Sequence, residues 1–143
     1  MADFYNEAKY ALLDQIKAHL AELGEVADAY PVYYQNIPLF PAVAIQTERR
    51  KKIKKGVNKV SEIELLFNVW TYVKIADFED AEAECMRLTE IVEKAIEKDK
   101  TLGGVAMYLT IDDELDFGVV ESNDGIFLQG SKILLTVKKR VQG

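Results

Sequence analysis

Positive charge is concentrated in one short segment of a chain that is acidic as a whole. The protein has 143 residues, with 18 Lys and Arg against 24 Asp and Glu, a formal net charge of −6. Residues 49–59 contain no acidic side chain and seven basic ones: Arg49, Arg50, Lys51, Lys52, Lys54, Lys55 and Lys59. Such a segment either solubilises a loop or binds an anionic partner. We favour binding, because seven like charges repel one another and a mixture of charges would serve solubility better.

Side chains that could do catalytic chemistry are sparse. The single histidine, His19, lies at the edge of an apolar helical stripe, which indicates a boundary residue with a hydrogen-bonded ring. The single cysteine, Cys85, lies within another such stripe, where a small buried side chain is expected. No nucleophile elbow, phosphate-binding loop or dinucleotide glycine pattern is present. The sequence therefore predicts no catalytic or cofactor-binding residue, although an enzyme with unrecognised chemistry stays open.

Acidic residues at 112–116 form a cluster that could in principle hold a divalent cation. The cluster lacks the glycine and the spaced carboxylates of a calcium-binding loop. We interpret it as a solvated connection between two strands, and we expect no metal site.

The first half of the chain predicts one helix and then strands. The helix covers residues 3–23, with Asp3 as its cap and Gly24 after its end. Extended segments follow at residues 26–34, 42–47 and 62–74, with prolines between the first two. The helical apolar stripe consists of Phe4, Ala8, Leu12, Ile16, Leu20 and Leu23.

The basic segment lies between two of these strands. We therefore expect it to form the tip of a long hairpin, projecting into solvent and mobile until an anionic surface meets it.

The strand at residues 62–74 has two apolar faces of unequal extent. Its odd positions are almost all apolar, which predicts that they face the core. Its even positions include Leu66, Trp70 and Tyr72, so a second surface must cover this face. Either another part of the chain covers it or a second copy does, in which case these three residues belong to a subunit interface.

The second half of the chain predicts another helix and a strand pair. The helix covers residues 78–98, with Asp77 as N-cap, and its outer face is acidic. A turn at 101–104 leads to strands at 105–112, 117–120 and 126–137, with a hairpin turn at 122–125. The apolar stripe of the helix consists of Phe78, Ala81, Cys85, Leu88, Val92 and Ala95.

This order of elements predicts one domain over residues 1–143. The fold class is α+β: a mainly antiparallel sheet with two helices packed on one face and a long basic hairpin.

This layout resembles the tail-terminator, or tail-completion, proteins of long-tailed bacteriophages. Their pattern is an N-terminal helix, a proline-flanked entry to a long strand, a long hairpin, a second helix and a closing strand pair. Here the entry is Phe-Pro-Ala-Val at residues 40–43, and helix 78–98 is followed by Thr-Leu-Gly-Gly at 101–104. The closing strand is Ile-Leu-Leu-Thr-Val at 133–137.

The resemblance implies a structural protein of the virion, assembled in the host cytoplasm and placed at the head–tail junction. Such proteins close into a homo-oligomeric ring, commonly a hexamer, that caps the tail tube and joins it to the head connector. The resemblance implies that the tube and connector proteins are partners, and that the basic hairpin faces the channel, where DNA passes, or a neighbouring ring. It implies neither a cofactor nor a membrane.

Two other interpretations stay open. One is a small nucleic-acid-binding domain that uses the basic hairpin loop, and the other is a different component of the head–tail connector. The first predicts DNA binding that weakens steeply with salt.

Overall fold

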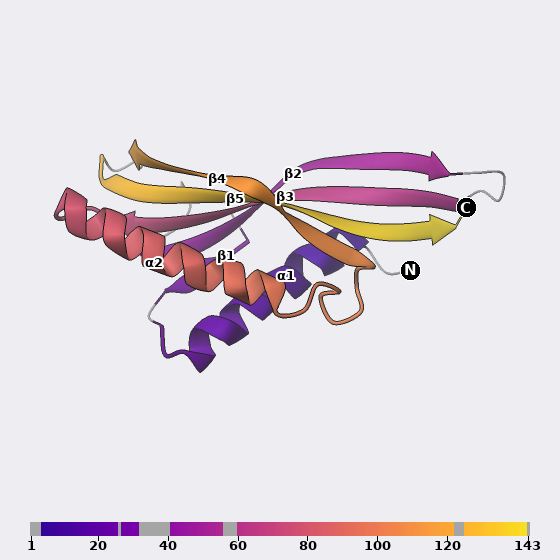
Figure 1. The fold of residues 1–143 in the computed structure, drawn as a ribbon, viewed down its shortest axis with the longest axis horizontal. Helices are drawn as coiled ribbons and strands as arrows, with labels where there is room; N and C mark the ends of the chain where they lie inside the picture. Colours follow the sequence, from indigo (N-terminus) through magenta and orange to yellow (C-terminus); the bar gives the residue numbers. More distant parts are fainter. Residues whose placement is uncertain (1–3, 26, 32–40, 56–59, 122–124, 143) are drawn as a thin grey trace.

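A computed structural model describes residues 4–25, 27–31, 41–55, 60–121 and 125–142 (Figure 1). Its elements, in chain order, are α1 (Phe4–Glu22), β1 (Asp28–Tyr30), β2 (Ala42–Lys55), β3 (Val60–Lys74), α2 (Phe78–Glu97), β4 (Tyr108–Glu121) and β5 (Phe127–Gln142). None of the described helices is long and apolar enough to cross a bilayer.

The strands form one five-stranded sheet in the order β1-β2-β3-β5-β4. Only the short β1 runs parallel to its neighbour, and every other pair is antiparallel. Both helices lie on the same side of the sheet (Figure 1). The predicted α+β class is therefore confirmed, as is the hairpin of β2 and β3.

Local signals at the ends of the helices act as the sequence indicated. The carboxylate of Asp77 accepts a hydrogen bond from the N–H of Asp80 at 3.1 Å, which caps the start of α2. Gly24 has φ of 70°, and its N–H donates to the carbonyl of Ala21 at 3.1 Å. This left-handed residue ends α1 and turns the chain toward β1.

The main core lies between the helices and one face of the sheet. On β3 the odd-numbered Leu65, Phe67 and Val69 are buried there, as predicted. A polar contact also joins the two layers, because the hydroxyls of Thr89 on α2 and Ser131 on β5 lie 2.7 Å apart. The pair satisfies two buried hydroxyl groups and fixes α2 against the sheet.

Side-chain hydrogen bonds and an ion pair join the two helices. The side-chain amide of Gln15 donates to the carbonyls of Ala95 and Ile96 at 2.9 and 3.0 Å. Arg87 of α2 contacts Glu25, just beyond α1, with Nη2 and Oε1 separated by 2.7 Å. The hydrogen bonds that Arg87 donates, first to Glu84 and second to Glu25, raise the pKa of its guanidinium.

The sheet is longer than the helical layer that covers it. β2, β3 and the last part of β5 continue beyond the helices as a flat extension (Figure 1). This extension, which we call the bare end, consists of residues 49–55 of β2, 60–66 of β3 and 136–142 of β5.

The extents of several predicted strands were wrong, including that of the strand expected at residues 126–137, which runs from Phe127 to Gln142 as β5. The strand expected at residues 42–47 continues to Lys55, and the two strands expected at 105–112 and 117–120 are one strand, β4. In β4 the acidic residues 112–114 stand opposite the single residue Leu134, because the pairing of Ile111 with Leu135 is followed by that of Leu115 with Ile133. The acidic cluster is thus a bulge within a strand rather than a connection.

Two residues placed in the apolar stripes are exposed instead. Leu23 is 53% exposed and Phe78 is 65% exposed, since each lies in a terminal turn that extends past its packing partners. The predictions for Asp3 and for most of residues 26–40 and 122–125 fall outside the described residues.

Candidate functional site

The basic segment is part of a paired strand. Arg49 pairs with Leu66 and the register continues without interruption to Lys55, which pairs with Val60. The expectation of a mobile tip is therefore wrong for residues 49–55, whereas Lys59 lies outside the described residues. The expected projection into solvent is confirmed for Arg49, Arg50, Lys51 and Lys52, which are exposed.

Strand geometry explains how the like charges are accommodated. Successive side chains of a strand point to opposite faces, so neighbours on one face are about 7 Å apart. Each face of β2 thus carries only half of the charge, and water lies on both sides.

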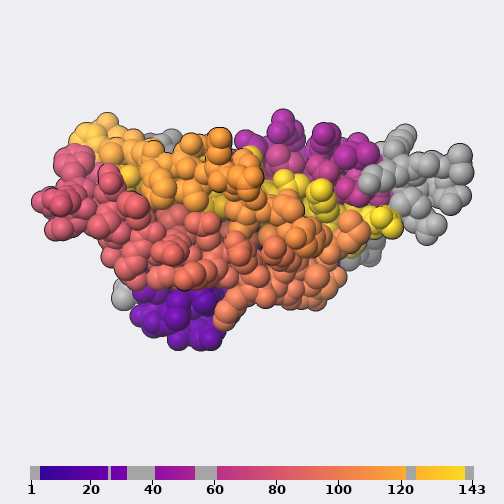
Figure 2. All heavy atoms as spheres, viewed as in Figure 1, coloured from indigo at the N-terminus to yellow at the C-terminus, as the bar shows by residue number. Residues whose placement is uncertain are grey.

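Three further cations join this segment from the other end of the chain. Lys138, Lys139 and Arg140 of β5 pair with Glu64, Ile63 and Glu62 of β3, which in turn pair with residues 51–53 of β2. Figure 2 shows that β2 and the end of β5 lie at the same end of the molecule. Sequence reasoning missed these cations, because only the long-range register brings them beside residues 49–52.

The two faces of the bare end differ in charge. On the face without helices, Glu64 lies between Lys51 and Lys138, and the carboxylate of Glu64 is 3.9 Å from Nζ of Lys138. On the helix side, Ile63 lies between Lys52 and Lys139, with no acidic residue in that row.

The helix-side row connects the bare end to the folded body. Nζ of Lys139 lies 4.9 Å from the ring centroid of Phe4, the first residue of α1. Arg50 is on this face too, because it pairs with the core residue Leu65. Arg50, Lys52 and Lys139 therefore form a basic surface on the helix side of the bare end, whereas the cations of the opposite face alternate with Glu62 and Glu64.

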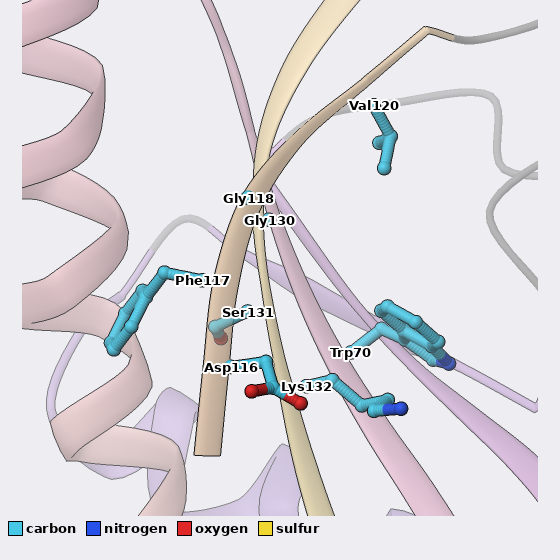
Figure 3. Close-up of a pocket in the computed structure, with 8 residues that line it drawn as sticks. All are labelled: Trp70, Asp116, Phe117, Gly118, Val120, Gly130, Ser131 and Lys132. Carbon is cyan, nitrogen blue, oxygen red and sulfur yellow. The ribbon is translucent and has the colours of Figure 1, made fainter.

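A hollow lies on the opposite, helix-free face of the sheet. Its floor is the paired glycines Gly118 and Gly130, which leave a cavity of about 170 Å³ beside Trp70, Lys132 and Asp116 (Figure 3). An added Cβ at Gly130 would lie 3.2 Å from the ring of Tyr72, whereas none of the described atoms lies within 4 Å of one at Gly118. The glycines thus make room for Tyr72 on one side and leave a recess on the other.

Trp70 is held at the edge of this hollow by three contacts. Its ring stacks on Tyr72 with centroids 5.9 Å apart, and its indole N–H donates to Oε1 of Gln46 at 3.1 Å. Nζ of Lys132 lies 5.6 Å from the Trp70 ring. A fixed aromatic wall beside a recess can receive a side chain of a partner.

The proposed interface residues on β3 differ in accessibility. Leu66 is 9% exposed and Tyr72 is 0% exposed within the single chain. Only Trp70, which is half-buried, keeps surface for a partner. Leu66 and Tyr72 are thus largely covered within the single chain, and the assignment of the three residues to a subunit interface stays a prediction.

The residues that could do chemistry do not converge. Nδ1 of His19 is buried with no hydrogen-bond partner in the described part of the chain, so the expected hydrogen bond of the ring is not found at this nitrogen. Burial raises the pKa of the Cys85 thiol, whose Sγ lies 3.9 Å from the carbonyl of Thr71. The described residues include no group of three or more His, Cys, Asp or Glu that could hold a metal ion.

Comparisons with known protein families and with curated protein sequences found no match.

Proposed function

We propose that this protein is a tail terminator of a long-tailed bacteriophage, a virion protein that forms a homo-oligomeric ring on the tail tube and joins it to the head connector. The resemblance in layout supports this proposal. So does the paired extension of the sheet, because strands that protrude from the body of the protein can reach a neighbouring ring or a channel.

The basic surface on the helix side of the bare end is the observation that carries the proposal. Arg50, Lys52 and Lys139 lie on one face with no acid in their rows, in a chain whose net charge is −6. A ring repeats such a surface around its axis, where it can meet the phosphates of passing DNA or acidic loops of the adjoining ring.

Electron microscopy of the purified protein tests this proposal. We expect negatively stained particles to be rings with an open centre. Loss of the gene in the phage that encodes it should give tails of uncontrolled length that fail to join heads. Separate small particles at every concentration, from protein with a folded circular-dichroism spectrum, would contradict the ring.

A nucleic-acid-binding domain is the second candidate, and the same basic surface favours it. This function predicts that the single chain binds duplex DNA, with log K falling against log salt by about 0.9 for each phosphate contacted. Three contacting cations would give a slope of about −3. Binding of this kind by a protein that forms no ring would favour the second candidate over the first.

A further inference from the structure

The sheet has two open edges that belong to different strands. Along β2, the short β1 covers only residues 42–44, so no described strand pairs with the outer side of residues 45–55. At the other end of the sheet, no described strand pairs with the outer side of β4. Open edges of this length present unpaired backbone groups and invite pairing with another chain.

These two edges carry opposite charge. β2 contains six basic residues and one acidic residue, a net +5. β4 contains five acidic residues and no basic one, a net −5. The central cations of β2, at 49–52, and the acidic residues 112–114 and 116 of β4 are all exposed.

The charges select one mode of association among three. Pairing β2 with β2 would oppose two rows of cations, and pairing β4 with β4 would oppose two rows of carboxylates. Both are unfavourable, since like charges across a strand pair repel. Only β2 of one copy against β4 of another brings opposite charges together.

Strand direction permits that pairing without rearrangement. β2, β3, β5 and β4 alternate in direction, so β4 runs antiparallel to β2. A second copy placed beside the first in the same orientation would continue this alternation. The irregularities after Thr47 and at residues 112–114 limit a continuous backbone ladder, so the side-chain charges carry most of the contact.

The acidic edge strand β4 also carries exposed apolar side chains. Phe117 and Val119 of β4 are 46% and 48% exposed. An exposed apolar strip beside complementary charge is typical of an interface rather than of a solvated strand.

We propose that this chain associates head to tail, with the basic edge of β2 in one copy against the acidic edge of β4 in the next. An interface between two different surfaces yields a closed ring or an open filament, and not a two-fold dimer. The inference rests on the proposed tail-terminator function for ring closure, while the edge contact can be tested separately.

Sedimentation velocity of charge-reversed variants tests this contact. The first variant combines Arg49→Glu, Lys51→Glu and Lys52→Glu, and the second combines Asp112→Lys, Asp113→Lys and Glu114→Lys. We expect the unaltered protein to assemble in low salt and each variant alone to associate at least about tenfold more weakly. An equimolar mixture should assemble again, because each variant then supplies the charge that the other lacks.

A further variant serves as the control. The same charge change on the helices, Glu7→Lys, Asp14→Lys and Glu79→Lys, should leave assembly intact. If circular dichroism shows that a triple variant does not fold, a double variant replaces it. The basic edge is then reversed by Lys51→Glu with Lys52→Glu, and the acidic edge by Asp113→Lys with Glu114→Lys.

The outcomes separate this inference from the proposed function. An unaltered protein that stays monomeric in low salt, reversed variants that assemble normally, or a mixture that stays monomeric would each overturn the edge contact. Rings that persist in the reversed variants would overturn the edge contact but would agree with the proposed tail-terminator function. Open filaments that are lost on charge reversal would support the edge contact and would contradict the proposed closed ring.

Discussion

The covered part of the sheet and its bare end are built from the same strands but do different work. Under the helices, β3 and β5 bury residues such as Phe67 and Leu135, both 0% exposed. Beyond the helices, β2 and β5 carry cations, and β3 between them carries Glu62 and Glu64. Regular strand pairing thus continues past the main core, to which the bare end contributes Leu65 and Val137 at its border.

Truncation of the core should give the largest effect and sharpen this comparison. Phe67→Ala removes a fully buried ring and should lower the free energy of unfolding by about 3–5 kcal/mol, as measured by urea denaturation. Phe127→Ala is the matched control, because Phe127 is 51% exposed and its truncation should cost far less. If the two variants lost the same free energy of unfolding, burial of the Phe67 side chain would not be a source of stability.

The paired glycines offer a finer comparison between two adjacent positions. Gly130→Ala brings a Cβ to 3.2 Å from the ring of buried Tyr72, and we expect it to cost about 1–3 kcal/mol of stability. Gly118→Ala meets open space and should be neutral or slightly stabilising. Thermal unfolding of the two variants side by side measures the difference, and a tolerated Gly130→Ala would show that Tyr72 moves freely.

The turn between α2 and β4 should give a smaller, pH-dependent effect. Asp99 accepts hydrogen bonds from the hydroxyl and the N–H of Thr101 and from the N–H of Gly103, and these lower its pKa. A lowered pKa in the folded state means that the ionised carboxylate stabilises the fold at neutral pH. This contribution is lost as pH falls below the unfolded value of about 3.9 and through the lower folded value.

Asp99→Asn should therefore lower the unfolding midpoint at pH 7 and change it much less at about pH 2.5. Thermal scans at both pH values measure this. The same decrease at both values would mean that the carboxylate charge has no part in holding the turn.

Much of the fold could be predicted from local sequence, and the candidate site only in part. The helix cap at Asp77 and the buried odd positions of β3 follow from short patterns. The charge of the run from Arg49 to Lys55, taken by itself, predicts a loop. Its pairing as a strand depends on β3, further along the chain. The same holds for Lys139, whose place beside Lys52 is set by register across three strands.

The burial of Tyr72 could not be predicted from residues near it in the sequence either. It depends on Gly130, 58 positions later, leaving room for the ring. A sequence pattern reports which face a residue occupies but not which neighbour on that face lacks a side chain.

The central claim is that the cations of the bare end act in assembly and not in folding. Sedimentation velocity and thermal unfolding of one sample, carrying Arg50→Ser, Lys51→Ser and Lys52→Ser together, test it most directly. We predict a stability within about 0.5 kcal/mol of the unaltered protein, as for most exposed substitutions, together with loss of the assembled species. A variant that unfolds, or one that keeps both its fold and its assembly, would contradict the claim.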